Sequence, residues 1–324
     1  MGAWGGLLAL AACGSDESAE GGDNVNRAPA QGFTDPNHLA LSDDGSRLVA
    51  LVDDGVAVWS TADGVRERTV DVEAVEGLAA QPTGDLVAVG GQGATIHLLD
   101  AATGDIGRTL TGHDGSSGGL RRLCFSPDGA QLASAGEDGA VRIWPVKGGA
   151  PVIARTAASQ PTSLAFAPRG EALVVGALDG ALQVVDPKTG RVERTLDNLP
   201  QQGVSVSFSG DGRWLAVAIS ATPQPGRVEL VDTRTWRQER DLITDLAPRH
   251  VLVSPDSRTV AVCDRRTKGV RLVPLGGGTA RTVKTPQDTP RSTVWSSDGA
   301  TLYALGESLV ALDVASGELL REFT

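Results

Sequence analysis

The side chains best suited to bind metals or to attack substrates are few and scattered in this 324-residue sequence. Its three cysteines, Cys13, Cys124 and Cys263, lie too far apart to form a disulfide framework, and no Cys-x-x-Cys pair or Cys/His cluster has the spacing of a zinc site. Of its four histidines, His38 and His250 fall at equivalent places in two repeats, but two donors do not complete a ligand set. We therefore predict no metal site and no cofactor.

Motifs of nucleophilic or phosphate chemistry do not stand out either. The sequence has no Gly-x-Ser-x-Gly elbow, no P-loop and no evident Ser/His/Asp arrangement. The glycine-rich segment at 90–93 is interpreted as a hairpin loop, because no helix follows it to bind a phosphate. An enzyme whose acids are scattered along the chain would escape such a search, so catalysis stays an alternative.

Basic side chains form a more informative pattern. The chain has 29 Lys and Arg against 40 Asp and Glu, a formal net charge of −11 that argues against general nucleic-acid binding. Within this acidic chain, eight basic residues lie beside strand-like segments in a way that would place most of them on one sector of one face. Either this sector binds an anionic ligand or an acidic partner segment, or it is ordinary solvated surface. The eight are Arg121, Arg122, Arg249, His250, Arg265, Arg266, Lys268 and Arg291.

The first 36 residues are typical of an export signal and a tether. Residues 1–12 form a short apolar run, too short to span a bilayer and suited to a signal peptide. The run ends in "LAAC", which resembles the lipobox of bacterial lipoproteins and would make Cys13 the lipidated residue. Residues 13–36 are polar and acidic, as a flexible tether would be. The alternative is an N-terminus with an incidental cysteine, since no Lys or Arg precedes the apolar run.

From residue 37 onward, one turn recurs seven times. The copies include "LSDDGSRLVAL", "FSPDGAQLAS" and "FSGDGRWLAV", in which Asp bonds the local backbone and Gly accepts a positive φ. Successive copies are 39 to 45 residues apart, a period typical of propellers. The last turn residue of each copy is Gly45, Gly84, Gly129, Gly170, Gly212, Ser257 and Gly299.

Alternating segments on both sides of each turn predict four short strands per repeat. The innermost strand carries bulky and small residues alternately, so one repeat cannot bury both of its faces alone. We predict an all-β fold: a seven-bladed β-propeller of four-stranded antiparallel blades over residues 37–324. A β-sandwich, the next choice, gives no reason for the period.

The segment "LASAGEDGAVRIW" at 132–144, preceded by "LTGHDG", resembles the core of a WD repeat. By this resemblance, His113, Ser134, Asp138 and Trp144 would form the structural hydrogen-bond network of that family, with Pro145 in place of its terminal Asp. The other blades depart from the motif, although the likeness extends over roughly residues 37–324. The resemblance implies a rigid propeller that binds protein or peptide partners.

Together these patterns predict a membrane-anchored, extracytoplasmic, WD-repeat-like propeller that acts as a monomeric, non-enzymatic interaction scaffold. Its partner would be a protein or peptide, and its membrane contact the lipid on Cys13. The alternative is an extracytoplasmic hydrolase or lactonase-like enzyme. Two convergent carboxylates with perturbed pKa values at the channel mouth would favour that enzyme.

Overall fold

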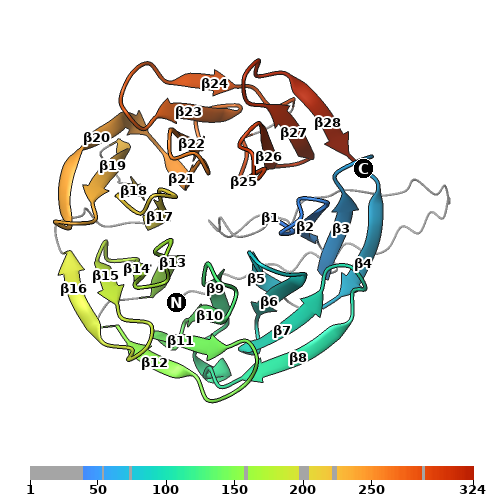
Figure 1. Ribbon diagram of the computed structural model, residues 1–324, viewed down its shortest axis with the longest axis vertical. Coiled ribbons are helices and arrows are strands. Elements are labelled where there is room, and N and C mark those ends of the chain that lie inside the picture. Colours follow the sequence, from blue (N-terminus) through green and yellow to red (C-terminus); the bar gives the residue numbers. More distant parts are fainter. Residues whose placement is uncertain are drawn as a thin grey trace, which may run out of the picture.

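Seven four-stranded antiparallel sheets are arranged in a ring (Figure 1). The computed structural model describes residues 39–52, 55–72, 75–156, 160–196, 204–220, 225–286 and 289–324. In each sheet the strands follow one another in chain order, from the centre of the ring to the rim. This arrangement confirms the predicted seven-bladed propeller. The signal peptide, Cys13 and the tether proposed from the sequence, as well as His38, lie outside the described residues.

The strands of each blade follow directly in the sequence. Blades one and two contain β1 (Leu39–Leu41), β2 (Arg47–Val52), β3 (Gly55–Ser60), β4 (Arg66–Asp71), β5 (Val75–Ala80), β6 (Leu86–Gly91), β7 (Thr95–Asp100) and β8 (Ile106–Thr111). Blades three and four contain β9 (Leu120–Phe125), β10 (Gln131–Gly136), β11 (Ala140–Pro145), β12 (Val152–Arg155), β13 (Pro161–Phe166), β14 (Leu173–Ala177), β15 (Leu182–Val185) and β16 (Val192–Leu196). Blades five to seven contain β17 (Val204–Phe208), β18 (Trp214–Ile219), β19 (Gly226–Asp232), β20 (Arg237–Leu246), β21 (Pro248–Val253), β22 (Thr259–Asp264), β23 (Val270–Pro274), β24 (Arg281–Val283), β25 (Ser292–Trp295), β26 (Thr301–Leu305), β27 (Leu309–Asp313) and β28 (Leu319–Phe323).

The recurring turn joins the first and second strands of each blade and is held by its own side chains. In five blades a serine Oγ donates to the carboxylate of the aspartate two residues later, at 2.5–2.7 Å. The same Oγ accepts the amide of the residue five positions later, at 2.9 Å. Ser257 adopts the left-handed conformation (φ 59°) that glycine has in the corresponding turns of five other blades. The turn is therefore encoded locally.

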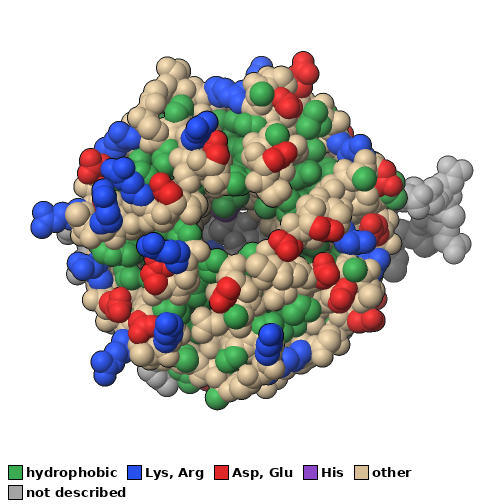
Figure 2. Space-filling view, viewed as in Figure 1, with side chains coloured by type: hydrophobic (Ala, Val, Ile, Leu, Met, Phe, Trp, Pro, Cys, Tyr) green, Lys and Arg blue, Asp and Glu red, His purple; other side chains and the backbone are tan. Residues whose placement is uncertain are grey.

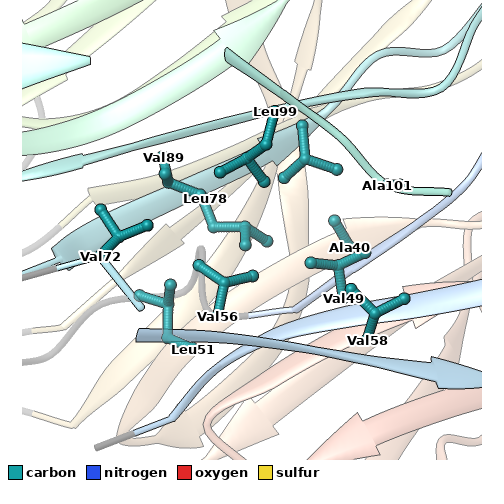
Figure 3. Close-up of a cluster of buried hydrophobic side chains, with 11 residues drawn as sticks. Ala40, Val49, Leu51, Val56, Val58, Val72, Leu78, Val89, Leu99 and Ala101 are labelled. Carbon is teal, nitrogen blue, oxygen red and sulfur yellow. The ribbon is translucent and has the colours of Figure 1, made fainter. Parts of the chain in front are cut away.

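Burial between blades follows the alternation of each strand. On β2, Val49 and Leu51 pack against blade two, whereas Leu48 and Ala50 pack against blade seven. Figure 3 shows the first of these interfaces, with Leu78 of blade two facing the side chains of blade one. Each of the seven interfaces contains its own cluster of buried hydrophobic residues. Every blade thus buries both faces only against its neighbours.

The ring closes between blades one and seven by side-chain packing. In the described part of the chain, neither blade takes a strand from the other. Phe323 of β28 is 1% exposed and lies in one cluster with Trp59 of blade one and Tyr303 of blade seven. The rings of Tyr303 and Phe323 meet edge to face, with centroids 6.1 Å apart. Closure therefore depends on hydrophobic burial at this interface.

Arginines on the outer strands add polar links between neighbouring blades. Six blades have an arginine at one equivalent position of the fourth strand. It pairs with the residue before the last buried hydrophobic residue of the third strand. These arginines are Arg68, Arg108, Arg194, Arg240, Arg281 and Arg321. Four of them donate to a backbone carbonyl in the next blade, in or beside the turn between its third and fourth strands. Arg240, for example, donates to the Leu275 carbonyl at 2.6 Å. A charged donor shared with a carbonyl is among the stronger hydrogen bonds.

Candidate functional site

The four residues of the WD-like motif meet in blade three. The Ser134 hydroxyl lies 2.7 Å from His113 Nε2 and accepts a hydrogen bond from Trp144 Nε1 at 2.8 Å. His113 Nδ1 lies 3.0 Å from Asp138 Oδ1, and the side chain of His113 is 1% exposed. The four groups thus form one connected chain of hydrogen bonds from the buried Trp144 ring to the turn between β10 and β11.

Arg142 joins this network, although the sequence analysis did not single it out. Its guanidinium donates to Asp138 Oδ2 at 2.7 Å. Burial alone would raise the pKa of the Asp138 carboxyl, but hydrogen bonds from the Asp114 amide, His113 and Arg142 outweigh it and lower the pKa to about 2. Burial also lowers the pKa of His113, although Asp138 opposes that shift. The carboxylate is thus held ionised beside a neutral imidazole.

Blade one shows what remains when the network is incomplete. Trp59 occupies the place that Trp144 has in blade three, but Ala50 stands where Ser134 would accept its indole N–H. Trp59 Nε1 is buried and has no hydrogen-bond partner among the described residues. The network therefore stabilises blade three, and its polar side chains form hydrogen bonds with one another within the fold.

Three of the eight basic residues of the predicted sector lie partly or fully in the interior. Arg122 is buried and donates to the Thr162 carbonyl of the neighbouring blade four. Arg121 is paired with Glu137. His250 is 8% exposed, and its Nε2 has no hydrogen-bond partner in the described part of the protein. Burial lowers the pKa of His250 to about 4, so this imidazole is neutral at pH 7.

The other five lie on blades six and seven. Arg265, Arg266 and Lys268 are exposed on the hairpin between β22 and β23. We call these three residues the basic hairpin. Arg266 contributes to an ion pair with Asp245 at 3.6 Å. Arg249 and Arg291 are partly exposed beside the beginnings of β21 and β25.

A second candidate site, which the sequence analysis missed, lies between blades four and five. A groove of about 550 Å³ runs between β15 and β16 on one side and β19 and β20 on the other, and a second of about 390 Å³ adjoins it toward the corner turns. Figure 2 shows basic side chains gathered at the rim over β16 and β20. Trp236 lines both grooves, and its ring meets Phe208 edge to face at 6.5 Å.

Trp236 occupies a turn position that is glycine in four other blades. Its amide donates to the Asp232 carbonyl at 2.7 Å, as the Gly104 amide does to the Asp100 carbonyl in blade two at 2.8 Å. Trp236 has φ 54°, a left-handed conformation that costs a non-glycine residue about 1–2 kcal/mol. The departure from Asp-x-x-Thr-Gly to Asp-x-x-Thr-Trp is the signal by which the sequence could have pointed to this groove.

Glu229 lines the larger groove and is completely buried. Its Oε1 accepts a hydrogen bond from Arg227 Nε at 2.6 Å, whereas Oε2 has no partner among the described residues. Burial raises the pKa of Glu229, against the opposing effect of Arg227. In the recurring turns, by contrast, serine hydroxyl bonds lower the pKa values of the aspartates.

Among the described residues, no group of three or more His, Cys, Asp or Glu side chains is arranged to hold a metal ion. No helix in that part of the chain has the length and apolar character needed to cross a membrane. The free thiol of Cys263 is buried, and that of Cys124 is partly exposed.

Comparisons with known proteins agree with the WD-like motif. The family model "WD domain, G-beta repeat" matches residues 104–145, the segment that contains the network of blade three. An uncharacterized WD repeat-containing protein of Synechocystis sp. is 34% identical over 109 residues, which are 33% of this chain and 30% of that protein. Telomerase Cajal body protein 1 of Homo sapiens is 28% identical over 238 residues, 68% of this chain and 42% of that protein.

Other matches are shorter in proportion or structural only. The periodic tryptophan protein 2 homolog of Schizosaccharomyces pombe is 32% identical over 37% of this chain, which spans only 14% of that protein's length. Among solved structures, a chain of the crystal structure of the mitotic checkpoint complex superimposes with a TM-score of 0.78. The superposition covers 95% of this chain and 98% of that chain at 17% identity, so it shows the fold alone.

Proposed function

We propose that this chain, a seven-bladed propeller that carries a WD repeat, is a non-enzymatic scaffold that binds a protein partner outside the cytoplasm. WD propellers typically act as protein-interaction scaffolds, which supports the general function. The observation that carries the specific proposal is the basic hairpin, which presents three cations together on a chain of net charge −11. A rigid ring that holds such a cluster suits an acidic segment of a partner, because cations in a fixed arrangement favour complementary carboxylates.

Charge reversal of the basic hairpin tests this proposal. We expect the double variant Arg265→Glu, Lys268→Glu to lower partner capture about tenfold, because two attractive contacts become repulsive. Capture is measured by chemical crosslinking in intact membranes followed by quantitative mass spectrometry. The matched control is Arg66→Glu, Lys147→Glu, which makes the same change of charge at exposed positions of blades one and three. Equal capture by the wild type and the Arg265/Lys268 variant would remove the basic hairpin from the proposed function.

The proposed location rests on the N-terminal sequence. We propose that residues 1–12 are a signal peptide, that Cys13 carries lipid and that residues 13–36 hold the propeller away from the membrane. Cys13→Ser is expected to move the protein from the membrane fraction to the soluble fraction, and globomycin is expected to block maturation of the wild type. The readouts are fractionation and the mass of the mature N-terminus. If Cys13→Ser stays with membranes and globomycin changes nothing, the lipid anchor is wrong.

A further inference from the structure

The interface between blades four and five combines three features. Arg194 has the position of the interblade arginines but, unlike the four that donate to the next blade, makes no hydrogen bond within the described residues; it lines the groove instead. Trp236 stands where four other turns have glycine. Glu229 is the only acid among the seven residues at its place on the third strands. All three side chains belong to one groove.

We propose that this groove binds an extended peptide segment of a protein partner, whose backbone bonds to Arg194 and Glu229 and whose apolar side chain packs on Trp236. This inference rests on the proposed function as an interaction scaffold. It names a surface on blades four and five that is separate from the basic hairpin on blade six. The two surfaces are therefore tested by different variants.

Arg194 indicates the first group that the occupant must supply. In blades one, two, five and six, the equivalent arginine donates to a backbone carbonyl of the next blade. The guanidinium of Arg194 is exposed and lacks that acceptor in the described structure. A carbonyl from a partner segment would take the place that a turn carbonyl has elsewhere in the ring.

Glu229 indicates the second group. A buried carboxylate oxygen without a donor carries an unmet desolvation penalty, which a hydrogen bond from the occupant would remove. The groove is the space that its side chain lines, so the donor is expected to come from there. A backbone N–H fits this requirement without bringing a second cation beside Arg227.

The charges of the groove exclude simpler occupants. A plain anion would meet the buried carboxylate of Glu229, and a plain cation would meet Arg194 and Arg237 at the lining. An extended peptide presents N–H and C=O groups alternately together with apolar side chains. It therefore satisfies Glu229, Arg194 and the partly exposed Trp236 ring at the same time.

The test uses a phage-displayed library of random twelve-residue peptides, depleted on the Trp236→Gly variant and then selected on the wild-type chain. We expect enriched peptides whose affinity, measured by fluorescence polarisation, falls at least tenfold in Trp236→Gly, Arg194→Ala and Glu229→Gln. In Glu229→Gln, Arg227 holds the amide oxygen and the amide nitrogen would face the incoming donor. Arg281→Ala, which changes the equivalent arginine of blade six, is the matched control and should leave affinity unchanged.

Folding does not confound this experiment. Trp236→Gly introduces the residue that four other blades have in this turn, and circular dichroism and melting temperature verify the fold of each variant. If no peptide is enriched over the depletion step, or if enriched peptides bind Trp236→Gly and Arg194→Ala as tightly as the wild type, the inference is overturned. Either result leaves capture through Arg265 and Lys268 standing, so this inference can fail without the proposed function failing.

Discussion

Replacement of Phe323 by alanine is expected to lower the free energy of unfolding by about 3–5 kcal/mol, the range for a large aromatic side chain removed from a core. Phe323 is fully buried in the cluster that joins blades one and seven. Because no strand is shared across this interface in the described residues, packing of this kind carries the closure. The loss is measured by urea-induced unfolding at pH 7.

The matched control is Leu320→Ala in the same strand. Leu320 is 55% exposed, so we expect its removal to change the free energy of unfolding by about 0.5 kcal/mol or less. Weaker packing between blades one and seven should also expose the backbone amides of these two blades. Phe323→Ala is therefore expected to speed amide hydrogen exchange more in β1 and β28 than in β13 or β17. A loss below about 1 kcal/mol for Phe323→Ala would show that closure has another basis.

Asp138→Asn is expected to lower the free energy of unfolding by about 3 kcal/mol at pH 7, the low end for breaking a buried ion pair. The variant keeps the shape of the side chain but removes the charge that holds His113 and Arg142. Asp128→Asn is the matched control in the same blade. That carboxylate is exposed in the corner turn, and we expect a loss of about 1 kcal/mol or less.

The effect of Asp138→Asn should depend on pH with a defined sign. The folded state holds the pKa of Asp138 at about 2, below the unfolded value of 3.8, so the ionised carboxylate stabilises the fold above pH 3.8. This contribution of the ionised carboxylate to the free energy of unfolding, about 2 kcal/mol, is lost as the pH falls from about 4 toward 2. The difference between wild type and variant should therefore shrink by about 1 kcal/mol between pH 6 and pH 3. A difference that stays constant down to pH 3 would contradict the shifted pKa.

The repeating part of the fold could be predicted because its signals are local. Serine, aspartate and glycine of the corner turn bond to one another within a few residues, so the turn identifies itself in each copy. The alternation of bulky and small residues on the inner strand then predicts two faces that need neighbours to bury them. The spacing of 39 to 45 residues between copies predicts the propeller. The network of His113, Ser134, Asp138 and Trp144 was expected only through the resemblance of this segment to a WD repeat.

The remaining features depend on contacts between blades, which a local pattern does not contain. Arg122 and His250 occur beside strand starts like the exposed basic residues, but the innermost strands of adjacent blades cover them. The groove at Trp236 lies between the sheets of blades four and five, so the sequence of a single repeat does not reveal it. Only the change from glycine to tryptophan is visible in the sequence.

In the described chain, the joint between the first and last blades is of the same kind as the other six: one hydrophobic cluster between two complete sheets. Each repeat is therefore a self-contained module. Duplication or deletion of one repeat in the gene would add or remove a whole sheet without splitting any other, and a circularly permuted chain with new ends between any two blades would keep every strand pair. The propeller can therefore gain or lose blades, or have its chain termini moved, through genetic events that leave every sheet intact.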